Sequence, residues 1–313
     1  MKLSDFVGNG EMLEQLMRSA RAGRIVHALL FAGASGAGKR TAAKLFVQAL
    51  YCTGAEKPCG ACPACRRVAE NTHPDVHVVR PDGRSILVEQ IRALIDAVSA
   101  MPYEGGFHTV IIEQADRMTD SAQNALLKTL ENPVVPVMFF LLSESVGGML
   151  PTVQSRCQIV RFRALTTEEC KGVLLKRGME VRRAELLAGL SGGSVGRALE
   201  MDADEEYFPL RERVIKSLKT LKGPGSVAAA AFVLSADKEK SGDVLEIMET
   251  LARDRMAVEN GAPAFGQEEA VPRIPGVNGE TLLMGVMEMR RKLRSNVSWQ
   301  NALEEMYFRI CAL

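Results

Sequence analysis

The stretch Leu29–Thr41, LLFAGASGAGKRT, decides the fold of the first half of this chain. It joins an apolar run, Ala28–Ala32, to a glycine-rich turn and then to a segment with helical periodicity, Thr41–Tyr51. A strand, a turn of backbone N–H groups and the positive end of a helix together form a phosphate-binding loop. The residues expected to line this loop are Gly33, Gly36, Gly38 and Lys39.

The loop departs from the usual pattern at one position. G-x-x-x-x-G-K is normally followed by Ser or Thr, whose hydroxyl holds Mg²⁺, but here Arg40 follows Lys39. Thr41 is not a simple substitute, because each further residue turns a helix by about 100°. We therefore expect a phosphate cradle without its metal ligand, and the residues leave open whether ATP or ADP binds.

Length, charge and hydropathy limit the kinds of protein that this sequence can encode. The 313 residues suffice for two or three domains. A formal net charge of +1 does not indicate a nucleic-acid or membrane partner for the chain as a whole. The beginning, MKLSDFVGNGE, lacks the apolar stretch of a signal peptide, and no apolar run approaches the ~20 residues of a membrane span. We expect a cytosolic protein.

Four of the seven cysteines form a C-x6-C-x2-C-x2-C array directly after the predicted helix: Cys52, Cys59, Cys62 and Cys65. Four close thiolates suit a tetrahedral, structural Zn²⁺ site. A [4Fe–4S] cluster is the alternative, although its usual fourth cysteine comes three residues later and precedes a proline. Val68 and Ala69 stand in that region instead. Free thiols also stay open, and zinc is the interpretation that we favour.

A second half of an ATPase site follows further along the chain. The buried strand Thr109–Ile112 ends in Glu113-Gln114. In a working site these two places hold an Asp that binds Mg²⁺ and a Glu that polarises water. Glutamine is neutral at every pH and cannot accept a proton from water. The sequence therefore predicts that this site does not turn ATP over.

The wider pattern indicates an α/β domain followed by helices. Apolar strands alternate with amphipathic helices, which is typical of a parallel sheet covered on both faces; the predicted strands are 28–32, 76–79, 109–112, 137–142 and 158–162. Thr166 and Glu169 have the spacing of a helix capping box. We predict a phosphate-loop domain over 1–164 with a four-cysteine module at about 52–65. A small helical domain over 165–204 and an all-helical domain over 205–313 follow.

Several motifs in this order resemble one known family. They are Arg24-x-x-His27-Ala28-x-Leu30-Phe31-x-Gly33, the four-cysteine insert, His73-Pro74-Asp75, Asn124–Glu131 (NALLKTLE) and Ser155-Arg156-Cys157. They resemble the clamp-loader subunits of bacterial DNA polymerase III, which are AAA+ ATPases. The motifs cover residues 24–157, and the helical remainder is similar to the lid and collar (oligomerisation) domains of that family.

The resemblance distinguishes two kinds of subunit. Motor subunits (gamma and tau) keep the Lys-Ser/Thr and Asp-Glu pairs, whereas a related non-motor subunit has lost them. Arg40 and Gln114 indicate the non-motor kind. The arginine expected after Gly-Ser in the lid also comes one residue late, as Arg197. The alternative is an active motor-type ATPase that uses Thr41 and Glu113 as unusual metal ligands.

The resemblance also implies partners and a role. The partners are gamma/tau motor subunits and the delta subunit, with the sliding clamp and primer-template DNA reached through the complex. The chain is then an accessory subunit of a DNA polymerase holoenzyme. In the family the arginine of Ser-Arg-Cys reaches ATP on the adjacent motor subunit, so Arg156 is expected to be exposed, before strand 158–162, as an arginine finger acting in trans.

Direct DNA contact has weaker support. Arg84 and Arg92 flank the start of a predicted helix and suit phosphates, but a solvated helix face explains them equally well. A zinc-dependent nucleic-acid-binding module is a further alternative, which the near-neutral charge disfavours.

Overall fold

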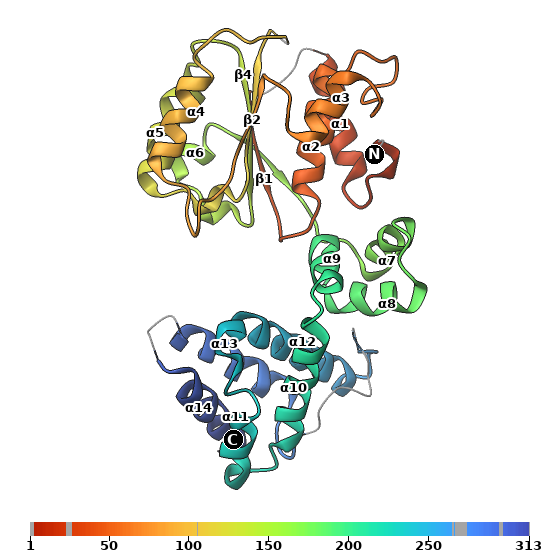
Figure 1. Ribbon diagram of the computed structural model, residues 1–313, viewed down its shortest axis with the longest axis vertical. Helices are drawn as coiled ribbons and strands as arrows, with labels where there is room; N and C mark the ends of the chain where they lie inside the picture. The colour runs from red at the N-terminus through yellow and green to blue at the C-terminus, as the bar shows by residue number, and fades with distance from the viewer. Residues whose placement is uncertain are drawn as a thin grey trace. The chain divides into compact units, whose positions relative to one another are not determined.

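The computed structural model describes residues 3–22, 27–104, 106–264, 266, 274–293 and 297–312. Arg24 of the first quoted motif lies outside these residues. The chain forms two compact units (Figure 1), one of residues 1–173 with 193–195, the other of 174–192 with 196–313. The finer division into domains 1–164, 165–204 and 205–313 stays a prediction.

The N-terminal unit is built on a five-stranded sheet in the order β2-β3-β4-β1-β5. The strands are β1 (Ala28–Ala32), β2 (Val76–Val79), β3 (His108–Ile112), β4 (Val137–Ser143) and β5 (Gln158–Arg161). Every neighbouring pair is parallel. All five strands therefore end at the same edge of the sheet, and the predicted parallel α/β fold is confirmed.

Helices cover both faces of this sheet (Figure 1). One face carries α1 (Gly10–Arg21), α2 (Lys39–Tyr51) and α3 (Pro63–Glu70); the other carries α4 (Val88–Ala97), α5 (Asp120–Glu131) and α6 (Pro151–Gln154). Successive strand residues alternate between the two cores. Phe31 and Phe140 pack on the α2 side, and their neighbours Leu30 and Phe139 pack on the α5 side. Burial on both faces explains why the inner strands β1, β3 and β4 are mainly apolar along their whole length.

Short 3-10 turns and α7 complete the unit and lead out of it. The turns are η1 (Leu3–Asp5), η2 (Ala115–Arg117) and η3 (Val146–Gly148), and α7 spans Thr167–Lys176. The predicted capping box at α7 is confirmed, because Thr166 N donates to Glu169 Oε2 at 2.9 Å and Glu169 N donates to Thr166 Oγ1 at 3.2 Å.

The C-terminal unit is helical, as predicted. Its elements are α8 (Val181–Leu190), α9 (Val195–Ala203), α10 (Tyr207–Thr220), η4 (Pro224–Ser226), α11 (Val227–Phe232), η5 (Asp237–Lys240), α12 (Ser241–Glu259), α13 (Gly279–Leu293) and α14 (Trp299–Ala312). Its core contains bonded polar groups: Tyr307 Oη lies 2.7 Å from Ser217 Oγ, and Trp299 Nε1 donates to Leu234 O at 2.7 Å.

Two α-helices, α3 and α6, were not among the elements predicted from the sequence. Helix α3 follows the third cysteine of the array, with Pro63 at its first turn and the Cys62 sulfur accepting from Cys65 N. Proline at the first helical position is a start signal that could have revealed it. Among the described residues, no helix has both the length and the apolar character needed to cross a membrane.

Candidate functional site

The phosphate loop lies where β1 ends, at the carboxyl edge of the sheet. Gly36 has a φ of +75°, and a Cβ there would stand 1.7 Å from Ser194 Oγ. Both the left-handed backbone and the close approach require glycine. Lys39 Nζ donates to Gly33 O at 2.5 Å and to Ala34 O at 2.8 Å, and burial lowers the pKa of Lys39. The ammonium group is thus bonded to its own loop.

Segments that sequence reasoning missed pack against this loop. Asn9 Nδ2 donates to Ala37 O at 3.4 Å and to Arg163 O at 3.1 Å, and Asn9 Oδ1 accepts from Arg163 N. The ring of Phe6 lies 3.1 Å from the place of a Cβ on Gly38. No motif marks either residue, since the contacts join segments that are far apart in sequence.

The two positions that would hold Mg²⁺ are joined by an ion pair. Arg40 Nε lies 2.9 Å from Glu113 Oε1, and Arg80 Nε lies 3.2 Å from Glu113 Oε2. Arginine has no acceptor atom and keeps its charge at all relevant pH values. A guanidinium therefore neutralises the carboxylate at the place where a working ATPase has a metal ion.

Two further details concern the same carboxyl edge. Arg80 was not predicted at the site. It directly follows β2, the neighbour of β3, and therefore lies at the same edge of the sheet. Gln114 has a φ of +52°, which is uncommon for a residue other than glycine.

Arg197, the late lid arginine, is bound within the C-terminal unit. Its Nε donates to Glu246 Oε1 at 2.8 Å, and its Nη2 lies 3.2 Å from Asp243 Oδ1. Both carboxylates belong to α12, so this charge is already matched there.

The four cysteines of the array come together as predicted. Their sulfur atoms all lie within 4.8 Å of one another. Cys52 directly follows α2, and Cys62 caps α3; Cys52 and Cys65 are buried. This group could hold a metal ion such as zinc. Cys157, Cys170 and Cys311 are not part of it.

The donor chemistry of the array fits a thiolate-bound metal. Cys59 N and Cys62 N each donate to the preceding cysteine sulfur, Cys52 Sγ and Cys59 Sγ, at 3.3 Å. Such bonds favour thiolates: the backbone N–H groups of Cys65 and Thr53 lower the pKa of Cys62 to about 5. Burial raises the pKa of Cys65 to about 12, and a coordinated cation would overcome that cost.

The backbone also approaches these sulfurs closely. A Cβ on Gly54 would stand 2.9 Å from the Cβ of Cys59, so a side chain at position 54 would force Cys59 to shift.

Arg156 lies on the turn between α6 and β5. Its Nε donates to Glu131 Oε1 at 2.6 Å, its Nη2 donates to the same oxygen, and its Nη1 donates to Thr152 O at 2.7 Å. The sequence predicts an exposed side chain, but the side chain is 31% exposed, because Glu131 and Thr152 hold it. Glu131 is the last residue of the motif NALLKTLE, and the motif by itself does not indicate a role for it.

Arg156 and the phosphate loop stand at opposite edges of the sheet. β5 is parallel to β1, with Gln158 opposite Leu29 and Arg161 opposite Ala32. Arg156 precedes the start of β5, whereas Gly33 follows the end of β1. A four-residue strand spans about 13 Å, so Arg156 does not face its own loop.

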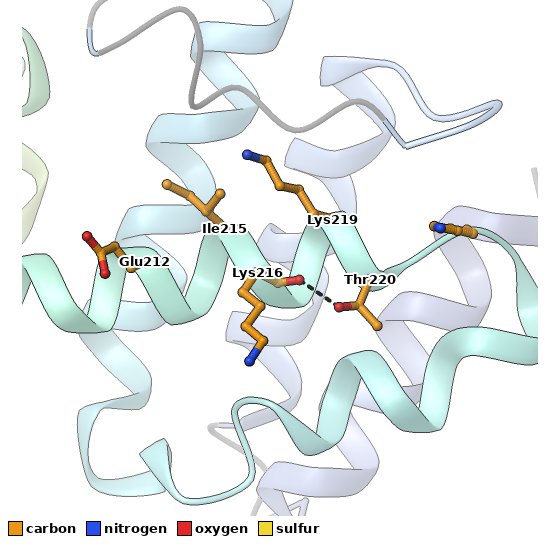
Figure 2. Close-up of a pocket in the computed structure, with 6 residues that line it drawn as sticks. Glu212, Ile215, Lys216, Lys219 and Thr220 are labelled. Carbon is orange, nitrogen blue, oxygen red and sulfur yellow. Dashed lines mark hydrogen bonds between the residues drawn. The ribbon is translucent and has the colours of Figure 1, made fainter.

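At two other places on the surface, the side chains described here do not point toward a common ligand position. Arg84 and Arg92 are exposed, as both open alternatives predict. A hollow of about 600 Å³ runs along α10, and Figure 2 shows Lys216 and Lys219 pointing away from each other there. The hydrogen bond drawn joins Thr220 Oγ1 to Lys216 O at 2.8 Å, within one helical turn. The lysines along α10 therefore have the features of a solvated helix face, whereas the exposure of Arg84 and Arg92 does not distinguish between their two alternatives.

Known proteins resemble the chain over most of its length. The family model described as "DNA polymerase III, delta subunit" matches residues 8–166. DNA polymerase III subunit delta' of Bacillus subtilis is 30% identical over 311 residues, which cover 94% of this chain and 94% of that protein. Subunit delta' of Escherichia coli is 31% identical over 255 residues, covering 80% of this chain and 75% of the relative.

Motor-type proteins are similar as well. DNA polymerase III subunit tau of Escherichia coli is 32% identical over 277 residues, which cover 85% of this chain and 41% of tau. The solved structure of a gamma subunit-related protein from Thermotoga maritima matches with a TM-score of 0.51 and 15% identity, covering 95% of this chain and 99% of that one. At this identity the match shows a shared fold.

Proposed function

The chain belongs to the family of DNA polymerase III delta' subunits, and from that premise we propose how it works as a subunit of the clamp loader, which its AAA+ fold suits. Our proposal has two parts. The subunit does not turn over ATP at its own phosphate loop, and it supplies Arg156 as an arginine finger to ATP held by a neighbouring motor subunit.

The observation that carries this proposal is the separation of two charged centres on one sheet. At the carboxyl edge, Arg40 and Glu113 pair with each other at 2.9 Å. At the amino edge, Arg156 stands before β5, with a strand length between it and its own loop. A finger in this position suits only a phosphate that comes from outside the chain.

The chemistry at the carboxyl edge supports a silent site. Hydrolysis of a nucleoside triphosphate needs Mg²⁺ between the phosphates and a residue that orients or deprotonates water. Here Arg40 occupies the hydroxyl position, Arg40 and Arg80 neutralise Glu113, and Gln114 cannot accept a proton. The loop retains Lys39 and its glycines, so these departures concern turnover more than phosphate binding.

The chemistry at the amino edge supports a finger. A guanidinium is planar, permanently charged and able to donate two parallel hydrogen bonds to phosphate oxygens. Arginine fingers of this kind accelerate phosphoryl transfer by roughly 10³–10⁵.

The proposal includes a metal and partners. Cys52, Cys59, Cys62 and Cys65 would hold one structural Zn²⁺, whose closed thiolate set leaves no position for catalysis. The partners would be gamma/tau motor subunits and the delta subunit, with the sliding clamp and primer-template DNA engaged through the complex in the bacterial cytoplasm.

The alternative function is that of a motor-type ATPase with Thr41 and Glu113 as metal ligands. The similarity to subunit tau favours it, whereas the pairing of Glu113 with two arginines opposes it. Steady-state ATPase of the purified chain separates the two: we expect no turnover above background, with or without primed DNA.

The experiment on Arg156 uses the reconstituted complex with a motor subunit, delta, the clamp and primed DNA. Arg156→Ala should leave assembly intact and lower DNA-stimulated ATPase partially, because only one site is served, while clamp loading falls further. Arg156→Lys should not fully rescue, because lysine lacks the planar fork. Arg177→Ala, at an exposed arginine, is the matched control. Normal clamp loading by Arg156→Ala complexes would refute the trans role.

A further inference from the structure

Glu131 is the acidic residue that touches the proposed finger. Its Oε1 accepts from Nε of Arg156 at 2.6 Å and from Nη2 as well. It ends α5, while Arg156 lies 25 positions further along the chain. We propose that Glu131 is a positioning residue that holds the Arg156 guanidinium ready for a phosphate on the neighbouring subunit. This inference rests on the trans role proposed above.

The geometry leaves part of the guanidinium for another ligand. Arginine has five N–H donors. Glu131 takes the side formed by Nε and Nη2, and Thr152 O accepts from Nη1 at 2.7 Å. Nη1 also contacts Ser155 Oγ, at a longer distance of 3.3 Å. The outer end of the fork, formed by the two terminal nitrogens, is therefore the part that can meet phosphate oxygens.

Both groups that hold Arg156 belong to helices that are attached to the rest of the N-terminal unit. The last turn of α5 is anchored where His27 Nε2 donates to Leu130 O at 2.6 Å, which ties Glu131 to the start of β1. Thr152 belongs to α6, in which Val153 is fully buried. A long flexible side chain is thus fixed at three of its donors before any partner arrives. Fixing it in advance reduces the ordering cost when the phosphate binds.

Stability alone does not account for this pair. The two side chains are 31% and 43% exposed, and ion pairs with this much solvent contribute little to folding. A surface pair of this kind can persist because it orients one partner. The consequence is measurable, since a positioning residue acts only through the residue that it positions.

The test is a double-mutant cycle in the reconstituted complex, with ATP, clamp and primed DNA. Glu131→Ala should reduce the Arg156-dependent part of the ATPase by about 10- to 100-fold, as expected for a misplaced catalytic group, and the KM for ATP should change little. In the Arg156→Ala background, Glu131→Ala should have no further effect. Glu131→Gln keeps one acceptor oxygen and should retain an intermediate rate. Glu70→Ala, at the exposed last residue of α3, is the matched control.

The other possible results contradict either the trans role of Arg156 or the positioning role of Glu131. If Arg156→Ala has no effect, the trans role fails and this inference falls with it. If Arg156→Ala lowers the rate but Glu131→Ala does not, or raises it, the trans role stands and the positioning role is wrong. Additive losses in the double variant would also overturn it, because Glu131 would then act independently of Arg156. Should Glu131→Ala fail to assemble, Glu131→Gln carries the same cycle.

Discussion

At the scale of single residues, two arginines differ in the nucleotide site on which we propose that they act: Arg40 blocks the chain's own site, and Arg156 serves the site of a neighbouring subunit. Arg40 is paired with Glu113 inside its own site and takes the place that a metal ligand has in a working ATPase. Arg156 is held by Glu131 and Thr152 at the far edge of the sheet. Both side chains are permanently charged, so the different roles that we propose for them rest on their positions and on the groups beside them.

The first prediction concerns Arg40. ATP titrations of the unmodified chain, followed by calorimetry, should give the same result with and without Mg²⁺. Arg40→Ser should bind ATP more tightly when Mg²⁺ is present, because Glu113 then loses its nearest cation and gains a hydroxyl beside it.

Arg80→Ser is the control for that experiment. It removes the other arginine from the same carboxylate and leaves Arg40 in place, so it should show no Mg²⁺ dependence. A dependence equal to that of Arg40→Ser would mean that Arg40 does not exclude the metal.

At the scale of elements, the four-cysteine module connects α2 to α3. Gln48 of α2 donates from Nε2 to Cys65 O at 2.8 Å, and Val68 of α3 packs in the same core as Phe46 of α2. A metal bound between these helix ends would therefore stabilise the α2–α3 face of the sheet.

The prediction for this module is one Zn²⁺ per chain by elemental analysis. Cys59→Ser should lower the melting temperature by roughly 5 °C or more, because the binding free energy of a structural metal contributes to folding. Cys311→Ser, outside the array, should leave both metal content and melting temperature nearly unchanged. Iron, or a metal-free chain after gentle purification, would contradict the assignment.

At the scale of the whole molecule, the two compact units each have a core of their own. All four histidines of the chain lie in the N-terminal unit. Burial lowers the pKa of His73 and of His77 below the ordinary value of 6.5. Groups of this kind are neutral in the folded state and gain protons more readily when unfolded.

Because the two units have separate cores, calorimetry should resolve two unfolding transitions.

The contribution of His73 and His77 to the stability of the N-terminal unit is complete above pH 6.5. It is lost as the pH falls from there toward their folded-state pKa values. Acidification from about pH 8 to pH 5.5 should thus lower the transition temperature of the N-terminal unit more than that of the C-terminal unit.

A variant identifies the sensitive transition. His77→Gln, on β2, should make that transition less dependent on pH over the same range. Equal shifts of both transitions on acidification would show that histidine burial is not the cause.

The sequence by itself determined most of the fold. β1 and β2 have the predicted bounds, and the other strands differ by one residue at an end. The signal is strongest at β1, β3 and β4, because these inner strands are buried along their whole length and are therefore mainly apolar. The cysteine array and the departures at Arg40 and Gln114 are also readable from spacing alone. Helices α3 and α6 were missed because both are short, and α3 begins inside the cysteine array.

Only the tertiary structure decided which charges meet. The partnership of Arg40 with Glu113 joins residues 73 positions apart, following β1 and β3, and Arg80 joins them from β2. The contact of Arg156 with Glu131 likewise depends on how α5 packs beside α6. Strand order and helix packing bring these side chains together, and a linear pattern of residue types does not contain the distances between elements.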